Sequence, residues 1–183
     1  RFMISENVIN DDPTATIESP KQKRTLPKTL TEGEVDLLIS TAGEGNTPES
    51  VRLVCLLEMI YATGLRVSEL VGLPLSALGE NLEFLMVAGK AGRERMVPIS
   101  ESAQTAIKSY LDVRKQHIGL DDKGQQAQWL FPSRTSESGH LTRQRFAQLL
   151  KDLADAAEID ADRVSPHILR HAFATHLLSN GAD

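Results

Sequence analysis

The stretch SPHILRHAFATHLL, residues 165–178, combines a clear helix start with a group of cationic side chains. Ser165 is a favourable N-cap and Pro166 suits the first helical position, so a helix is predicted to begin there. His167 and Arg170 lie three residues apart and therefore leave the same face of the first turn. Free backbone N–H groups and the helix dipole favour negative charge at this end of a helix. The stretch therefore predicts an anion site.

Helix-start signals recur upstream of this stretch and indicate a mostly helical chain. Thr31 begins a capping-box pattern that places a helix start at about Glu32. Thr47 and Pro48 open a second, strongly apolar helix that ends near Gly64. The remaining predicted helical elements are a short turn or helix at 66–70, a helix from 100 towards 117, and an amphipathic helix after 142.

One hairpin is predicted among these helices. Two β-like runs, 82–88 and 93–99, flank the glycine-bracketed tip at 89–92, a pattern typical of two antiparallel strands. The short apolar piece 129–131 is a candidate further strand of the same sheet. The predicted fold class is α+β, mostly helical with a small antiparallel sheet.

Composition and charge narrow the class of protein. The 183 residues carry a net charge of −5, which argues only weakly against a nucleic-acid partner, because basic residues still cluster at 21–28 and 90–95. No apolar run is long enough to span a bilayer and no secretory signal is visible, so membrane insertion is not expected. The single cysteine, Cys55, lies in an apolar run and fits a buried position in a reducing, cytoplasmic setting.

Four cationic side chains lie at the edges of the predicted elements. Arg66 follows the helix end at Gly64, Lys90 occupies the hairpin tip, and His167 and Arg170 occupy a helix start. Guanidinium forks bind the non-bridging oxygens of a phosphate in pairs, and an ammonium group can deliver a proton. Because no partnered acidic cluster accompanies them, these residue types suit a phosphate that gains charge in its transition state.

Simpler interpretations stay open when each motif is taken alone. Arg66 could be a helix C-terminal cation that complements the dipole, Lys90 an ordinary turn residue, and His176 a core side chain. His167 and His171 have the i, i+4 spacing of two zinc ligands on a helix. Neither the metalloprotease glutamate nor a third ligand accompanies them, so a zinc site is disfavoured.

Three motifs together resemble the tyrosine recombinases, the phage integrase family. They are YATGLRVSEL at 61–70, the Gly-Lys hairpin tip with its two following arginines, and SPHxxRHxFATH at 165–176. The arginine box and the His-x-x-Arg box are specific in this order and spacing, whereas either alone would be weak. The resemblance covers nearly the whole chain and is strongest to the bacterial Xer recombinases. The lead-ins DDPT at 11–14 and LPKTL at 26–30 favour the D subtype.

The resemblance implies a role for each of the four cationic residues. Arg66 and Arg170 would clamp the scissile phosphate of DNA, and His167 would hydrogen-bond it and assist proton transfer. Lys90 would protonate the departing 5′ oxygen. The implied reaction is transesterification of a DNA strand through a 3′-phosphotyrosyl link, with no metal and no nucleotide cofactor.

The same resemblance implies a supporting group around this site. Glu69 would orient Arg66 from one helical turn away, and His171 would support the active-site wall. Basic side chains close to the site would contact the DNA backbone and set the position of the protein on the duplex. The expected DNA contacts are Lys21, Lys23, Arg24, Arg93, Arg95, Arg143 and Arg145.

The chain departs from the family pattern at its end. The family places its nucleophilic tyrosine downstream of the His-x-x-Arg helix, whereas this sequence ends at Asp183. Tyr61 and Tyr110 do not match the position of the nucleophile, so the chain as given is expected not to cleave DNA. We expect a fragment with three parts: a remnant of an N-terminal helical domain (1–9), an inter-domain linker (10–29) and a C-terminally truncated catalytic domain (30–183).

The resemblance also implies partners. They are a double-stranded DNA recombination site, a second Xer-type recombinase in a heterotetrameric synapse, and a septum-located DNA translocase. The implied process is chromosome dimer resolution at cell division. Two alternatives stay open: a phage or transposon integrase with the same chemistry, and a non-catalytic DNA-binding module whose arginines only hold phosphate.

Overall fold

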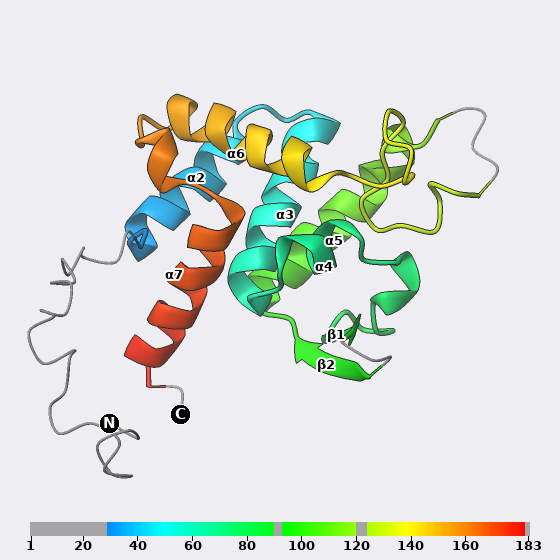
Figure 1. Cartoon of the computed structure of the whole chain (residues 1–183), viewed down its shortest axis with the longest axis horizontal. Coiled ribbons are helices and arrows are strands. Elements are labelled where there is room, and N and C mark those ends of the chain that lie inside the picture. The colour runs from blue at the N-terminus through cyan, green and yellow to red at the C-terminus, as the bar shows by residue number, and fades with distance from the viewer. Residues whose placement is uncertain (1–28, 90–92, 120–123, 182–183) are drawn as a thin grey trace, which may run out of the picture.

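Helices dominate the computed structural model, which describes residues 29–89, 93–119 and 124–181. The predicted class, mostly helical with a small antiparallel sheet, is confirmed. The expected remnant 1–9 and all but the last residue of the expected linker 10–29 lie outside the described residues. In chain order, with η for short 3-10 helices, the elements are α2 (Glu32–Gly43), α3 (Pro48–Thr63), α4 (Val67–Val71), η1 (Leu75–Ala77), β1 (Phe84–Ala88), β2 (Glu94–Pro98), α5 (Glu101–Val113), η3 (Arg114–His117), α6 (Arg143–Ala156), η4 (Ala161–Arg163) and α7 (Pro166–Ser179) (Figure 1).

The helices begin where the sequence signals placed them. In each case the side-chain oxygen of the N-cap accepts a hydrogen bond from the backbone N–H three residues further on, which satisfies a donor that the first turn leaves free. The helix predicted from 100 towards 117 is divided, since α5 ends at Val113 and η3 continues to His117. The N-caps with this hydrogen bond are Thr31, Thr47, Ser100, Thr142 and Ser165.

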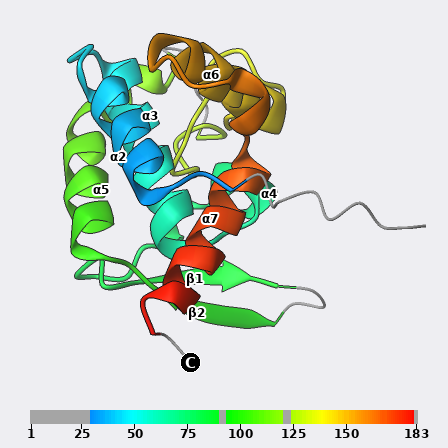
Figure 2. The ribbon, with the colours of Figure 1, turned by 90° about the vertical axis from the view of Figure 1, so that its left-hand side faces the viewer.

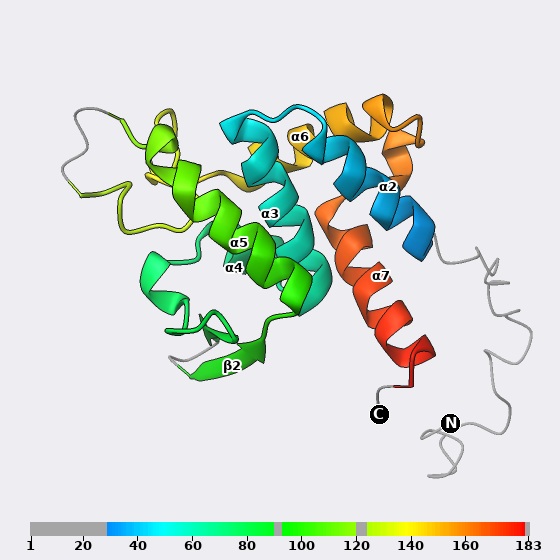
Figure 3. The same cartoon turned by 180° about the vertical axis from the view of Figure 1, so that it is seen from behind.

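Helix α3 forms the centre of the hydrophobic core. Its residues Leu56, Leu57 and Ile60 are buried, and so is Cys55, as its apolar surroundings predicted. Helices α5 and α7 pack on different sides of α3, α2 lies against it as well, and α6 crosses the end of this group (Figures 2 and 3). The longest described helix, α3, has 16 residues, and none of the described helices is long and apolar enough to cross a membrane.

The sheet consists of β1 and β2 within the described residues. The strands are antiparallel, with Leu85 opposite Val97 and Val87 opposite Arg95. Leu85 and Val87 are buried, whereas β2 is mostly exposed and 65% of Met96 is accessible to solvent. The hairpin therefore covers the core with one strand and presents the other strand outwards.

The segment 129–131 does not join the sheet, so the suggested third strand is wrong. The backbone N–H of Leu130 donates to the carbonyl of Leu73 at 2.8 Å, beside an isolated bridge between Pro74 and Trp129. The buried guanidinium of Arg114 donates through Nε to the carbonyls of Trp129 and Leu130, each at 3.1 Å. A buried guanidinium needs acceptors for its donors, and the carbonyls of Trp129 and Leu130 supply them, whereas the carbonyl of Phe131 accepts from the N–H of Leu141.

Candidate active site

Arg66 lies at the junction between two helices. α3 ends at Gly64, whose φ of 58° is left-handed, and Arg66 then becomes the N-cap residue of α4. The backbone N–H of Arg66 donates to Oε2 of Glu69 at 2.8 Å, and its Nη1 donates to Oε1 at 3.1 Å. Glu69 therefore holds Arg66 from one turn further along α4. The Arg66 side chain stays 65% exposed and is accessible to a ligand.

A second arginine reaches the same carboxylate from the hairpin. Nη2 of Arg95 on β2 donates to Oε2 of Glu69 at 2.9 Å. Arg95 lies opposite the buried Val87, and directly opposed residues share a face of a sheet, so its side chain is directed towards α4. The sequence motifs did not indicate this pair, because the register of the hairpin is known only from the structure. Arg95 was expected to contact DNA, and in the structure its side chain pairs with Glu69 and remains 42% exposed.

The two guanidinium groups determine the charge of Glu69. Burial of its side chain, which is 14% exposed, favours a raised pKa, but the hydrogen bonds from Arg95 and Arg66 outweigh this effect. The pKa of Glu69 therefore lies below its usual value, and the carboxylate is charged at neutral pH. A charged Glu69 positions Arg66 and links α4 to the hairpin at the same time.

The start of α7 carries the other half of the predicted anion site. His167 is exposed there, and so is His171 one turn further on. Arg170 is partly buried, and its Nη1 is a buried donor with no hydrogen-bond partner among the described residues. An unpartnered buried donor costs free energy, and a donor on a cation costs more than a neutral one, unless an acceptor approaches it. Arg170 therefore keeps donor capacity that the described residues do not use.

The contact between Gly64 and Phe173 brings the two motifs together. A Cβ built on Gly64 would lie 2.5 Å from both Cδ1 and Cε1 of the Phe173 ring, so the end of α3 lies directly against α7. Arg66 follows Gly64 by two residues, and Arg170 precedes Phe173 by three. The packing therefore places the two arginine-bearing segments beside each other.

Tyr61 and His176 form a second contact between these helices. The hydroxyl of Tyr61 lies 2.8 Å from Nδ1 of His176, and the two rings meet edge to face. His176 is partly buried at this interface, where core packing was one of the alternatives. Burial raises the pKa of Tyr61, and nearby acidic residues act in the same direction, so its hydroxyl stays protonated at neutral pH. The sequence did not indicate this pair: the resemblance placed Arg66 and Arg170 on one phosphate but did not show which side chains meet between α3 and α7.

A hollow of about 350 Å³ connects three helix starts around His167. Its lining includes Val67 at the start of α4, Arg143 and Gln144 at the start of α6, and Pro166 at the start of α7. His167 is thus close to the residue that follows Arg66. Most of the exposed lining is apolar, so the hollow itself is not an anion site; it shows that Arg143, an expected DNA contact, lies beside His167.

Other predicted residues lie apart from this hollow or outside the described chain. The N–H of Gly89 donates to the carbonyl of Arg93 at 2.6 Å, so the pairing of the two strands extends to these two residues. Arg93 and Arg145 are exposed, and Arg145 lines a different hollow from the one with His167. Residues that lie outside the described ones are Lys21, Lys23, Arg24 and Lys90.

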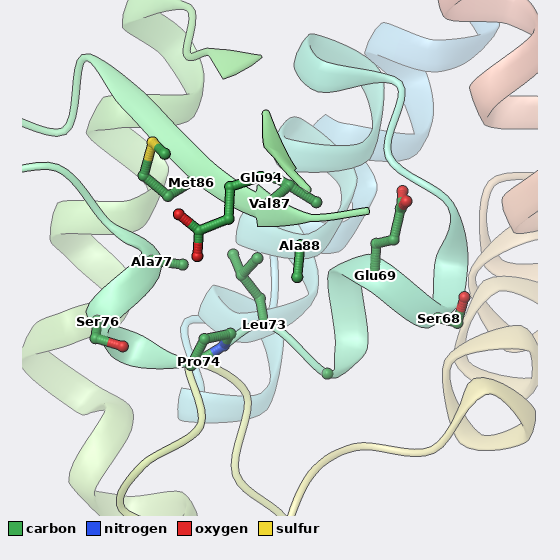
Figure 4. Close-up of a pocket in the computed structure, with 11 residues that line it drawn as sticks. Ser68, Glu69, Leu73, Pro74, Ser76, Ala77, Met86, Val87, Ala88 and Glu94 are labelled. Carbon is green, nitrogen blue, oxygen red and sulfur yellow. The ribbon is translucent and has the colours of Figure 1, made fainter. Parts of the chain in front are cut away.

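A separate pocket of about 350 Å³ lies between α4, η1 and the hairpin (Figure 4). Its charged lining residues are Glu69 and Glu94, and Leu73 and Met86 provide apolar walls. No arginine or lysine occurs among its described lining residues. An acidic lining repels a phosphate, so this pocket is not part of the anion site although it shares Glu69 with it.

The chain matches the phage integrase family over residues 28–183. It is 47% identical over 184 residues to the tyrosine recombinase XerD of Caulobacter vibrioides, covering 100% of this chain and 59% of that protein. It is 44% identical over 185 residues to the tyrosine recombinase XerC of Erythrobacter litoralis, covering 100% of this chain and 56% of that protein. The chain thus spans less than two thirds of the length of these relatives.

Solved structures of recombinases share this fold. XerA recombinase matches with a TM-score of 0.69 and 30% identity, over 85% of this chain and 52% of that chain. XerH recombinase bound to its difH substrate in a pre-cleavage complex matches with a TM-score of 0.69 and 20% identity, over 87% of this chain and 45% of that chain. The similarity to XerH shows the fold alone. The chain therefore belongs to the phage integrase family of tyrosine recombinases, as its motifs predicted, and within that family it is similar to the Xer recombinases and leans towards the D subtype.

Proposed function

We propose that this chain is the catalytic domain of a site-specific recombinase that cleaves and rejoins DNA strands through a 3′-phosphotyrosyl intermediate. The observation that carries the proposal is the buried, unpartnered Nη1 of Arg170 beside the segment of Arg66. A guanidinium with a free donor binds phosphate better than one whose donors are already satisfied within the protein. Membership of the phage integrase family supports DNA as the source of that phosphate.

Each residue of the site has one task in this proposal. Arg66 and Arg170 bind non-bridging oxygens of the scissile phosphate and stabilise the charge that grows there in the transition state. His167 hydrogen-bonds the phosphate and assists transfer of the proton of the attacking tyrosine. As the tyrosine oxygen bonds to phosphorus, the bond to the 5′ oxygen breaks, and Lys90 gives that oxygen a proton. The phosphotyrosyl ester keeps the bond energy, so the reverse step rejoins a strand without a cofactor.

We further propose that the attacking tyrosine lies outside these 183 residues. Tyr110 is fully buried, and burial raises the pKa of its hydroxyl. Tyr61 is hydrogen-bonded to His176 in the interface between α3 and α7. Neither hydroxyl is presented to the anion site. The chain alone should therefore bind DNA without cleaving it.

Trapping of the covalent intermediate tests the proposal. The product of the complete reading frame is incubated with a nicked suicide duplex that carries a recombination site of its genome. Cleavage releases a short strand that diffuses away, so the intermediate accumulates. The expected result is a protein–DNA adduct that survives denaturation and is removed by protease, whereas the 183-residue chain gives none. If the complete product binds DNA but forms no adduct, the proposal that it is an enzyme is wrong. The alternative of a non-catalytic DNA-binding module would then be favoured.

The similarity to XerD and XerC relatives favours a chromosomal role. In this proposal the partners are a second Xer-type recombinase in a heterotetrameric synapse on double-stranded DNA and a septum-located translocase. The process is chromosome dimer resolution in the cytoplasm. Recombination between two chromosomal sites should then require the second recombinase. Activity on the ends of a mobile element, without that partner, would instead indicate a phage or transposon integrase.

Replacing Arg95 with glutamine tests its role as a positioning residue. The variant is expected to slow adduct formation about tenfold, which corresponds to the loss of one hydrogen bond between charged groups. The cause is that Glu69 loses one partner and holds Arg66 less well. DNA affinity should change little, and Arg95→Lys should restore part of the rate. Arg93→Gln is the matched control, since Arg93 is an exposed neighbour on the same hairpin. Equal losses of DNA affinity in both variants, with no selective loss of rate, would make Arg95 a DNA contact only.

A further inference from the structure

A cationic pocket of about 610 Å³ lies on the other side of the α6 start from His167. It is formed where the first turns of α3 and α6 meet η3 and the loop 133–135. Three arginines line it: Arg52 from α3, Arg134 from the loop and Arg145 from α6. We call this the Arg52 pocket. None of its described lining residues also lines the hollow around His167, so the two sites are distinct.

The charges of the three arginines are not neutralised within the described chain. None of them forms an ion pair with a described carboxylate. Nε of Arg52 is buried without a hydrogen-bond partner there, and Arg134 donates to the carbonyl of Gln116. Burial lowers the pKa of Arg52; the charges of Tyr110 and Glu49 oppose this effect, and the positive charge of Arg145 adds to it. Like charges held together around an unsatisfied donor raise the free energy of the pocket until an anion binds.

His117 forms a neutral wall of this pocket. It is buried, and its Nε2 lies 3.1 Å from the carbonyl oxygen of Pro48. Burial lowers the pKa of His117, and the charge of Arg52 lowers it further, so the ring is neutral at neutral pH and its Nε2–H donates to Pro48. Glu49 is the one acidic residue among the described lining residues. Three guanidinium groups against one carboxylate leave an excess of positive charge.

The chemistry of this lining recognises phosphate. Guanidinium forks bind phosphate oxygens in pairs, and Arg52, Arg134 and Arg145 line one space. The hydroxyls of Ser133 and Thr135 add neutral donors to the lining. Hydroxyl and guanidinium donors around one space are the usual partners of backbone phosphates in protein–DNA interfaces.

Helix α6 places the Arg52 pocket next to the expected position of DNA. Arg143 lines the hollow with His167, and Arg145, two residues later, lines the Arg52 pocket. A helix with its side chains is about 10–12 Å across, and a duplex presents phosphates at every nucleotide of both strands. We propose that Arg52, Arg134 and Arg145 bind a non-scissile backbone phosphate of the same DNA molecule. This inference rests on the proposed function, in which DNA occupies the site of Arg66 and Arg170.

Salt-dependent DNA binding by the 183-residue chain tests the second phosphate site. Affinity for a short duplex of arbitrary sequence is measured at several salt concentrations for the wild type, Arg145→Gln and Arg52→Gln. Each lost phosphate contact is expected to reduce the slope of log affinity against log salt by about 0.9. Lys151→Gln is the matched control, because Lys151 is an exposed cation on α6 outside the Arg52 pocket. Arg145 is exposed, so its variant keeps the test valid even if Arg52→Gln fails to fold.

The outcomes separate this inference from the proposed function. If the wild-type chain does not bind the duplex, the proposed function fails. If it binds, and Arg170→Gln weakens binding while Arg145→Gln and Arg52→Gln keep the wild-type slope, only the second phosphate site is wrong. Binding of polyglutamate by the same variants is a further measurement. If the variants lose polyglutamate binding with an unchanged DNA slope, the pocket takes an acidic protein segment, and the DNA assignment is overturned.

Discussion

Replacing Arg170 with alanine in the product of the complete reading frame is expected to slow adduct formation by about 100- to 1,000-fold, the usual effect of removing one preorganised donor from a transition state. The guanidinium has a buried Nη1 that no described residue satisfies, so its binding capacity is directed to a ligand. The measurement is single-turnover adduct formation on the suicide duplex, at protein concentrations that saturate the DNA. Under these conditions a change in rate reports on the chemical step and not on binding.

Three comparisons make the Arg170 experiment decisive. Arg170→Lys keeps the positive charge but loses the planar fork, so its rate should lie between those of the wild type and Arg170→Ala. Lys151→Ala removes an exposed cation elsewhere and should leave the rate unchanged. Because Nη1 makes no hydrogen bond within the described chain, Arg170→Ala should not cost a structural hydrogen bond. If Arg170→Ala forms the adduct at the wild-type rate, Arg170 is not part of the active site. A large loss of stability with the loss of rate would assign Arg170 a structural role.

Local structure was predictable from the sequence because its causes are local. Thr31, Thr47 and Ser165 each cap a helix through a backbone N–H only three residues away, so the signal and the structure lie in the same short window. Gly64 marked the end of α3 for the same reason, since a left-handed residue after a helix favours glycine. The family motifs then identified candidate site residues by their spacing.

Contacts between distant segments were not predictable in this way. A helical period shows which face of a helix is buried but not which element covers it. The hydrogen bond of Tyr61 with His176 joins positions 115 apart, and that of Arg163 with Glu34 joins positions 129 apart. Glu34 is the third helical residue of the capping box that Thr31 begins, and its carboxylate also accepts from Arg163 at 2.7 Å. Only the packed structure shows that one side chain serves both purposes.

The same limit applies to the candidate site. Spacing predicted Arg66 and Arg170 as phosphate ligands, but spacing carries no information on which donors are already satisfied. The structure distinguishes Arg95, which is paired with Glu69, from Arg52, whose Nε has no partner among the described residues. The sequence placed Arg95 among the expected DNA contacts and attached no expectation to Arg52. The difference lies in burial and in the neighbours that the fold supplies.

Replacing Gly64 with alanine is expected to destabilise the protein by about 2–4 kcal/mol, from left-handed backbone strain and from overpacking against Phe173. Gly64 has a φ of 58°, and a Cβ there would lie 2.5 Å from two atoms of the Phe173 ring. Urea unfolding measures the loss. Gly33→Ala is the matched control, because a Cβ at Gly33, in α2, meets nothing within 4 Å and Gly33 has no positive φ. Helix propensity predicts that this control is neutral or slightly stabilising.

Two further variants separate the causes of the Gly64 effect. Gly64→Asn tolerates a left-handed backbone but still meets Phe173, so it should retain the packing part of the loss. Phe173→Leu combined with Gly64→Ala should recover part of the stability, and a double-mutant cycle gives the coupling between the two positions. The rate of adduct formation should also fall in the variants whose new side chain presses against Phe173. A displacement of about 1 Å between the segments of Arg66 and Arg170 is enough to slow catalysis about 100-fold. Additive effects of the two substitutions would contradict the contact between α3 and α7 that brings the arginines together.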